Sequence, residues 1–433
     1  MTEPIKAIVV GAGHRALLYA SYAQTHPDEL KIVGVADPRS HRREQVARLY
    51  NLPAKRCYPT AQAIADVPKF ADVVINGTMD HQHVVTSLPL LRAGYDMLLE
   101  KPFATSESDM WELVAAAKRW DRQVLVCHVL RYADFYTAIR QRVLDGCIGD
   151  ILSVQTVEHV SYHHMAMGFV RGKWAREQHG YASMLMAKCC HDLDLIAWMK
   201  SGVKPHAVAS FGSNFQFKPE RAPAGAGTRC LLDCGIEPTC LYSARKHYID
   251  HPERWHFYVW DSVEHLGPLT LEDKITSLRD SNPFGRCVWD CEMDVVDHQS
   301  VVVEFEDGAT ATHDMVGGTA KPSRSIHLVG TEGEIQGNFE ESRFVVRAID
   351  PRPGREYAEE SVDLAIDGDI HGAFARHGGG DLRLVEDFVR VVRGEAPSIS
   401  TTSLDDSVAG HLIGFSADQA MTEQRLVSIS LRR

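Results

Sequence analysis

The sequence lacks the long apolar runs and the excess of basic residues that would place it in a membrane or on nucleic acid. No apolar run approaches ~20 residues, the length that a helix needs to span a bilayer. The formal net charge is −12 at pH 7, whereas a surface for a phosphate backbone needs clustered Lys and Arg. Membrane-spanning proteins and general nucleic-acid-binding proteins are therefore poor matches to the composition.

The chain also lacks internal repeats, heptad arrays and low-complexity segments. Its 433 residues, 44% hydrophobic and 24% charged, are typical of a soluble globular protein with two domains. A strand-like pattern begins near residue 5 and leaves no room for a signal peptide, so we expect a cytoplasmic protein. In that compartment the ten cysteines are expected to be thiols or metal ligands instead of disulfides.

The arrangement of strand-like and helix-like segments changes along the chain. In residues 1–126, short aliphatic runs such as KAIVVGA and ADVVINGT alternate with helical patterns, which predicts βαβ units and a parallel sheet. Residues 127–433 contain longer alternating strands with the turn residues EDG and TEGE, which predict a largely antiparallel sheet. Helices near 381–394 and 404–423 close this second domain, and we expect them to pack back on the first. The sequence thus predicts an α/β protein of two domains.

A glycine-rich turn follows the first predicted strand. The segment GAGHRA places Gly11, Gly13 and Ala16 between a strand and a helix, the context that the dinucleotide-binding fingerprint requires. Gly11 permits a tight turn, and Gly13 lets the backbone approach a pyrophosphate. A βα turn that uses glycine only for its geometry is the alternative. The cofactor contacts expected from this turn are Gly11, Ala12, Gly13, His14 and Arg15.

An acidic residue ends the second predicted strand. Asp37, in VGVADPR, lies 24 residues after Gly13, where a carboxylate can accept hydrogen bonds from the hydroxyl groups of an adenosine ribose. The same carboxylate would repel a 2′-phosphate, so NAD is favoured over NADP, although Arg39 leaves the second cofactor open. A turn-forming residue before Pro38 is the alternative interpretation of Asp37.

A second motif, MLLEKPFATS, follows the fifth aliphatic run. Glu100 and Lys101 stand at the carboxyl end of a predicted strand, where ligands bind in open α/β sheets. An ammonium group there can hydrogen-bond a substrate hydroxyl and relay its proton during hydride transfer. A solvated surface lysine is the alternative.

With these motifs the sequence resembles the Gfo/Idh/MocA oxidoreductases, the glucose–fructose oxidoreductase and inositol dehydrogenase group. The matching segments are VVGAGHRA, VGVADPR, NGTMDHQHVVTSLPLLRAGYDMLLEKPFA and AKCCHDLDLIAWM. Thr78 and His83 keep their places in the family's usual Thr-Pro-Asn-x-x-His segment, whereas Met79 and Asp80 depart from it. With this resemblance we also expect cofactor contacts from Thr78, His83 and Arg131. The resemblance implies a Rossmann domain joined to an α/β domain with a large open sheet. It also implies a nicotinamide cofactor, a sugar, polyol or glycoside substrate, and a homodimer or homotetramer.

The segment MLMAKCCHDLDLIAWM is predicted to be one helix. Lys188, His191 and Asp194 recur along it at spacings of three and can hold a sugar hydroxyl and take its proton. We expect Lys101, His191 and Lys188 to be catalytic and Asp194 to bind substrate. A polar helical stripe at a domain boundary is the alternative. Many family members place an Asp where this chain has Ala187, and Lys188 is expected to compensate.

The segment YHHMAMGFVRGKWARE is the candidate substrate wall. His164 and Arg171 can hydrogen-bond hydroxyls or an anionic group, and Trp174 can stack on a sugar face. His377, in the predicted loop ARHGGGD, is expected to join them. A solvated basic loop is the alternative for each of these residues.

Half of the cysteines fall in the irregular stretch 214–292. Four of them are spaced so that they can bind a structural zinc ion through thiolates, namely Cys230, Cys234, Cys240 and Cys287. Buried thiols that pack an irregular insertion are the alternative.

Together these features favour an NAD-dependent dehydrogenase acting on the CH–OH group of a sugar, polyol or glycoside. Two other functions remain open. Some family members retain NAD and cleave a glycosidic bond through transient oxidation and elimination, because a ketone acidifies the neighbouring C–H. A non-catalytic NAD-binding sensor is the second.

Overall fold

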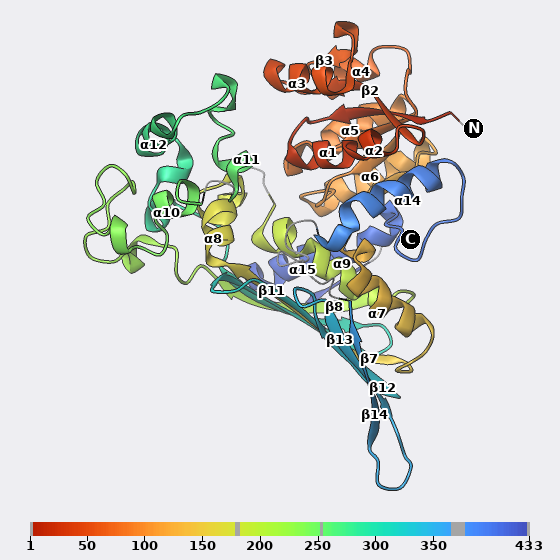
Figure 1. The fold of residues 1–433 in the computed structure, drawn as a ribbon. Helices are drawn as coiled ribbons and strands as arrows, with labels where there is room; N and C mark the ends of the chain where they lie inside the picture. Colours follow the sequence, from red (N-terminus) through yellow and green to blue (C-terminus); the bar gives the residue numbers. More distant parts are fainter. Residues whose placement is uncertain (1–2, 178–181, 252–253, 365–376, 431–433) are drawn as a thin grey trace.

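The computed structural model describes residues 3–177, 182–251, 254–364 and 377–430, and it contains two sheets (Figure 1). The first sheet has six parallel strands in the order β3-β2-β1-β4-β5-β6, which is the Rossmann order. Its strands are β1 Ile5–Val10, β2 Leu30–Ala36, β3 Cys57–Tyr58, β4 Val73–Asn76, β5 Asp96–Leu99 and β6 Val124–Val126. The predicted parallel sheet is confirmed.

Helices connect these strands and bury them. The central strand β4 is buried at all four positions, as expected for a sheet covered on both faces. Ser106 caps α6 by accepting a hydrogen bond from the Asp109 N–H (3.2 Å), and acidic residues in the first turn and basic residues in the last complement the helix dipole. The helices are α1 His14–Ala20, α2 Tyr22–Thr25, α3 Ser40–Tyr50, α4 Ala61–Ala65, α5 His83–Arg92 and α6 Glu107–Arg119.

The second sheet has nine strands in the order β14-β13-β12-β11-β7-β10-β9-β8-β15. All neighbours are antiparallel except β7 and β10, which are parallel. The predicted, mostly antiparallel sheet is therefore confirmed. Its strands are β7 Ile151–Ser161, β8 Pro205–Ser213, β9 His298–Phe305, β10 Thr310–Thr319, β11 Ser323–Gly330, β12 Gly333–Asn338, β13 Arg343–Ile349, β14 Tyr357–Asp363 and β15 Val427–Ser428.

Helices lie on one face of this sheet, as Figure 1 shows for α7 Asp134–Leu144, α9 Cys190–Met199 and α15 Leu404–Glu423. The strands accordingly alternate: in β9, Val301 and Val303 are buried, whereas Val302 between them is 49% exposed. Such alternation is expected of a sheet with one covered face.

The C-terminal helices pack against the first domain. Leu384 and Phe388 of α14 (Gly380–Val392) share a buried cluster with Val9 of β1. Leu412 of α15 shares another cluster with Leu113 of α6. Since α15 also lies on α9 and β8, these helices join the two domains.

Residues between β8 and β9 form an insertion with a small core of its own, which includes Cys230, Tyr248, Val259 and Leu278. The stretch expected to be irregular contains α10 Ala244–Tyr248, α11 His256–Val259 and α12 Leu271–Asp280. A short helix, α8 Tyr162–His164, and two π-helical segments, Met165–Val170 and Leu185–Cys189, lie near the insertion and before α9. The remaining short helices are of the 3-10 type: Ala54–Arg56, Asp80–Gln82, Val129–Tyr132, Lys173–Ala175, Pro219–Arg221, Glu237–Thr239, Glu264–Leu266, Pro283–Gly285, Val288–Asp290 and His377–Gly379. None of the described helices combines the length and apolar character needed to cross a bilayer.

Candidate active site

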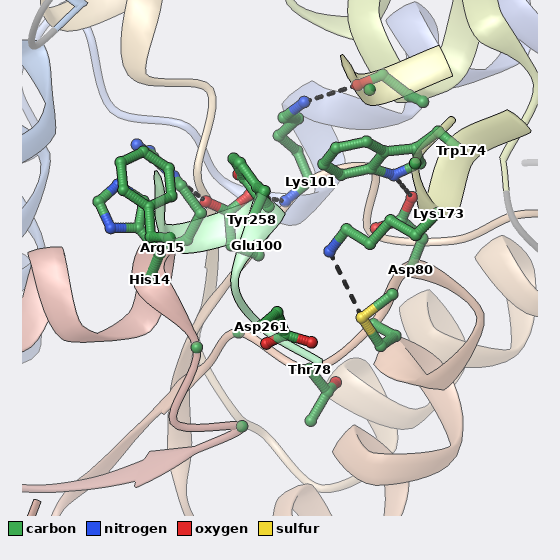
Figure 2. Close-up of a pocket in the computed structure, with 18 of the residues that line it drawn as sticks. His14, Arg15, Thr78, Asp80, Glu100, Lys101, Lys173, Trp174, Tyr258 and Asp261 are labelled. Carbon is green, nitrogen blue, oxygen red and sulfur yellow. Dashed lines mark hydrogen bonds and ion pairs between the residues drawn. The ribbon is translucent and has the colours of Figure 1, made fainter. Parts of the chain in front are cut away.

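A cavity of about 1200 Å³ lies between the two domains and the insertion. In Figure 2 its side chains surround one space, with His14 and Arg15 on the left and Lys173 and Trp174 on the right. The predicted site residues that line it are Gly11, Gly13, His14, Arg15, Asp37, Arg39, Thr78, His83, Glu100, Lys101, His164, Arg171, Trp174, Lys188 and His191.

The glycine turn forms one end of the cavity. Gly11 has a φ of +75°, and a Cβ there would lie 2.7 Å from the Thr78 backbone nitrogen, so a side chain would strike the neighbouring loop. Gly13 caps α1 with extended backbone, and the nearest heavy atom to a Cβ at Gly13 would be 3.8 Å away. Gly11 therefore serves the turn, and Gly13 keeps space open above it.

Asp37 is held against this turn. Its side chain is buried, with one oxygen accepting a hydrogen bond from the Ala12 N–H (2.8 Å) and the other from the Arg39 N–H (2.9 Å). Each carboxylate oxygen has a second acceptor site for a ligand hydroxyl. The carboxylate is therefore oriented by the backbone and still able to bind a ribose.

Arg15 and the buried Glu100 form an ion pair beside the glycine turn. Arg15 Nε donates to Glu100 Oε1 (2.8 Å), and its Nη2 pairs with Asp381 (2.6 Å) at the start of α14. Burial raises the pKa of Glu100, but Arg15 and Lys101 outweigh that effect and lower it to about 2. Glu100 is therefore an ionised carboxylate that positions its neighbours.

His14 contacts the insertion and remains exposed on its other side. Its ring stacks on Phe257 of α11, with centroids 3.8 Å apart and planes 8° from parallel. Burial and the adjacent Arg15 guanidinium lower the pKa of His14 to about 4, so the ring is neutral at pH 7.

Lys101 reaches across the cavity to the second domain. Its Nζ donates a hydrogen bond to the Ala187 carbonyl (2.8 Å), inside the π-helical segment before α9. The contact involves the position at which many family members carry an Asp, so the backbone of Ala187 provides an acceptor there. His83 supports the turn after β5 that carries Lys101. Its ring nitrogens face the carbonyl oxygens of Pro102 (2.7 Å) and Thr78 (3.1 Å).

The three residues predicted to share one helical face, Lys188, His191 and Asp194, lie in two different environments. Lys188 and His191 line the cavity, and Lys188 Nζ pairs with the buried Glu158 (3.0 Å). Asp194 instead binds Arg131 through two hydrogen bonds of 2.6 and 2.7 Å, away from the cavity lining. The π-helical turn at Leu185–Cys189 alters the helical spacing that had placed Lys188 and Asp194 on one face. Arg131 and Asp194 thus form a buried bidentate pair.

The residues predicted to form the substrate wall have different surroundings. Trp174 Nε1 donates to Asp80 Oδ2 (2.8 Å), which fixes the indole at the cavity wall. The Arg171 guanidinium is 1% exposed and donates to the carbonyl oxygens of Arg286 and Tyr242, both at 2.7 Å, so it is used to hold the insertion. Burial, reinforced by Lys188, lowers the pKa of His164 well below its ordinary value. The side chain of His377 lies outside the described residues.

Sequence reasoning did not assign roles to several residues of this cavity. Asp80 accepts the hydrogen bond from the Trp174 indole. In the sequence, the departure of Asp80 from the family pattern could have pointed to this role. Lys173 Nζ lies 4.4 Å from the Trp174 ring centroid and donates to the Met79 thioether (3.4 Å), while burial lowers the pKa of this lysine. Phe257 and Tyr258 also line the cavity. In the sequence, the aromatic run WHFYVW could have indicated that Phe257 and Tyr258 line a binding cavity.

The predicted zinc site is not assembled. Among the described residues, Cys230, Cys234, Cys240 and Cys287 do not place three sulfur atoms within 4.8 Å of one another. Cys230 and Cys287 instead pack in hydrophobic clusters. One group of metal-binding type occurs elsewhere in the described chain, formed by Cys189, Asp192 and His313. There the Arg324 guanidinium donates to Asp192 (3.1 Å) and supplies the positive charge.

Known proteins show the same two-domain organisation. Residues 5–128 match the Gfo/Idh/MocA oxidoreductase family with its NAD-binding Rossmann fold, and residues 140–404 match the C-terminal alpha/beta domain of that family. YteT of Bacillus subtilis, named as an oxidoreductase, is 26% identical over 352 residues, which cover 76% of this chain and 78% of YteT.

Solved structures share the fold over nearly the whole chain. Levoglucosan dehydrogenase, in complex with NADH and levoglucosan, has a TM-score of 0.69 at 17% identity, covering 99% of this chain and 100% of that one. Myo-inositol 2-dehydrogenase from Lactobacillus plantarum has a TM-score of 0.65 at 16% identity, with the same coverage. The two family matches together span most of the chain. The chain therefore belongs to the Gfo/Idh/MocA oxidoreductase family, and its first domain is an NAD-binding Rossmann fold.

Proposed function

We propose that this chain is an NAD-dependent dehydrogenase that oxidises a hydroxyl-bearing carbon of a sugar, polyol or glycoside. The observation that carries the proposal is a convergence within one cavity. Lys101 of the first domain and His191 of the second line the same space as the Gly11–Gly13 turn. A dinucleotide lying along the turn would bring its nicotinamide ring toward these two polar groups.

The residues present fit a dinucleotide. A Cβ at Gly11 would fill the turn, the space above Gly13 is open, and Asp37 is oriented to accept ribose hydroxyls. When bound, NAD supplies the hydride acceptor. Glu100, ionised and paired with Arg15, holds the wall of this pocket in place.

We assign to His191 the acceptance of the substrate's hydroxyl proton. We assign to Lys101 a hydrogen bond to the substrate's hydroxyl oxygen. Lys101 directly follows Glu100 in the chain, and its Nζ donates one N–H to the Ala187 carbonyl. The remaining N–H groups can donate to the substrate hydroxyl oxygen. His191 then accepts the hydroxyl proton as the carbon loses its hydride, and the products are a ketone and a protonated imidazole.

The substrate class is supported by the cavity wall and by the solved relatives. Trp174 offers an aromatic face that Asp80 holds in place, and aromatic faces suit the apolar faces of sugar rings. Two proteins of the same fold are named for levoglucosan and myo-inositol.

The test is a screen of the purified protein with NAD against sugars, polyols and glycosides, following both NADH and cleavage products. We expect NADH to form with at least one substrate. Lys101→Met and His191→Asn should each lower kcat by roughly 10²–10⁴-fold. Lys118→Met, at a lysine whose side chain is 65% exposed, serves as the control.

Other results would point away from net oxidation. Cleavage products without NADH would replace the proposal by transient oxidation and elimination. Dinucleotide binding without either product across the screen would favour a sensor.

We further propose that the uncovered face of the nine-stranded sheet joins two copies of the chain. This face lies opposite the covering helices (Figure 1) and exposes Phe211, Val302 and Val316 at 77%, 49% and 38%. Exposed apolar side chains gathered on one face are typical of an interaction surface. Light scattering should give a dimer or tetramer, and Phe211→Asp with Val302→Asp should yield monomers. A monomeric parent protein would contradict this proposal.

A further inference from the structure

The insertion contacts the first domain through a cluster of charged side chains. Arg39 Nη1 lies 2.9 Å from both Asp261 Oδ1 and Glu264 Oε1. Arg42 Nε donates to the same Glu264 oxygen (2.8 Å), and its other end contacts Asp261. His41 Nε2 also faces Glu264 at 2.7 Å. Two carboxylates from the segment after α11 therefore form ion pairs with two arginines at the start of α3.

This cluster stands at the adenosine end of the cavity. Arg39 follows Asp37 by two residues and donates its backbone N–H to that carboxylate. Asp37, Arg39, Arg42 and Asp261 all line the cavity. In the proposed binding mode, Asp37 receives the ribose hydroxyls, so the arginines and their acidic partners lie beside the ribose 2′ position.

The charges at this end determine what the 2′ position can carry. Two guanidinium groups beside a ribose are a favourable site for a phosphate, which arginine binds through two parallel hydrogen bonds. Here the two guanidinium groups are paired with the carboxylates of Asp261 and Glu264. The Asp37 carboxylate, held by the Ala12 and Arg39 backbone N–H groups, adds a further negative charge at the same end of the cavity. Burial raises the pKa of Glu264, but hydrogen bonds from Arg42 and His41 outweigh it and lower the pKa to about 2, which leaves this group ionised at neutral pH.

We propose that Asp261 and Glu264 determine the cofactor specificity of this enzyme. Their carboxylates hold the Arg39 and Arg42 guanidinium groups that would otherwise bind a 2′-phosphate, and they add negative charge where that phosphate would lie. NAD, with a 2′-hydroxyl, is accepted by Asp37, and NADP is rejected. The inference rests on the proposed dinucleotide binding and extends it from the end of β2 to an acidic pair in the insertion.

The test compares the affinities of NADH and NADPH, measured by fluorescence titration of the purified protein. In the double variant Asp261→Asn/Glu264→Gln, we expect the affinity for NADPH to rise roughly tenfold or more, because like-charge repulsion is removed and two arginines are released. The affinity for NADH should change by less than about threefold, since its 2′-hydroxyl carries no charge. Adding Arg39→Ala to the double variant should abolish the gain in NADPH affinity.

A matched control removes the same number of charges elsewhere in the insertion. Glu220→Gln/Glu272→Gln changes two exposed carboxylates, and it should leave both affinities unchanged. If the double variant does not fold, the single Glu264→Gln variant should still show an intermediate gain in NADPH affinity.

Two results would count against the inference, and they are distinguishable. A folded double variant that binds NADH as before but gains nothing toward NADPH overturns the role of Asp261 and Glu264 alone. A parent protein that binds neither dinucleotide overturns the proposed function together with this inference.

Discussion

Gly11 illustrates how single residues determine the shape of this cavity. Its φ of +75° lies in the left-handed region, and three backbone atoms of Gly77 and Thr78 lie within 2.8 Å of where a Cβ would stand. Glu100 is constrained in another way, since its buried carboxylate remains charged beside Arg15 and Lys101. At both positions the local surroundings allow few other side chains.

Gly11→Ala should abolish measurable dinucleotide binding. The methyl group collides with rigid backbone, so the β1–α1 turn must move away from the position that a pyrophosphate needs. Gly354→Ala is the matched control, because Gly354 has a similar φ of +80° but no heavy atom within 4 Å of a Cβ. Both variants carry the strain of a left-handed alanine, about 1–2 kcal/mol. Fluorescence titration with NADH should therefore separate them, and equal affinity in the two would refute the role given to the turn.

At the scale of elements, loops and π-helical turns bring the two domains together at the cavity. The loop after β4 holds Trp174 through Asp80, and the turn after β5 sends Lys101 to the carbonyl of Ala187. Both partner segments, Lys173–Ala175 and Leu185–Cys189, come from the second domain. π-helical turns of this kind often occur at functional sites. This wall of the cavity thus depends on contacts between elements far apart in the sequence.

Asp80→Ala should raise KM for the sugar substrate more than it lowers kcat. Without the carboxylate, the Trp174 indole loses its acceptor and is no longer held at one orientation. The lost hydrogen bond to a charged group is worth about 1.5–3 kcal/mol, or roughly 10–150-fold in affinity. Asp80→Asn, which keeps an amide oxygen as acceptor, should retain most of the affinity. In a Trp174→Phe background, Asp80→Ala should add little, and a full additional loss there would show that Asp80 acts through another partner.

At the scale of the whole molecule, the domains and the insertion bury many ionisable side chains. His247 is 2% exposed; burial and the nearby Arg171 lower its pKa to about 3. The unfolded chain takes up a proton at this histidine below about pH 6.5, whereas the folded chain does so only near pH 3. The free energy of unfolding therefore decreases as the pH falls from about 6.5 toward 3.

The His247→Gln variant should be less sensitive to acid than the parent protein. His247 alone accounts for a loss of about 2 kcal/mol between pH 7 and pH 5, by the linkage of proton uptake to unfolding. Gln retains an amide N–H for the Leu241 carbonyl that the ring faces at 2.8 Å, but it does not titrate. Urea unfolding at the two pH values measures the difference. Equal losses of stability in parent and variant would contradict the shifted pKa.

Local sequence was sufficient wherever a feature depends on neighbouring residues. The alternation of strands and helices up to residue 126 and the period-two strands after residue 150 predicted both sheets. The glycine turn and Asp37 were recognisable because a strand, a left-handed turn and a helix follow one another within one short segment. The parallel pairing of β7 with β10, strands separated by nearly 150 residues, left no such local signal.

Only the tertiary structure decided which polar groups face the cavity. Asp194 and Arg131 pair with each other, Arg171 holds the insertion, and Asp261 covers arginines more than 200 residues away. A helical period indicates which residues share a face, but it does not indicate what packs against that face. The sequence by itself determined the two kinds of sheet and the glycine turn after β1, because backbone conformation and hydrophobic periodicity are local properties. The cavity wall around Trp174 and the acidic partners of Arg39 and Arg42 arise from contacts between distant segments, and only folding brings those segments together.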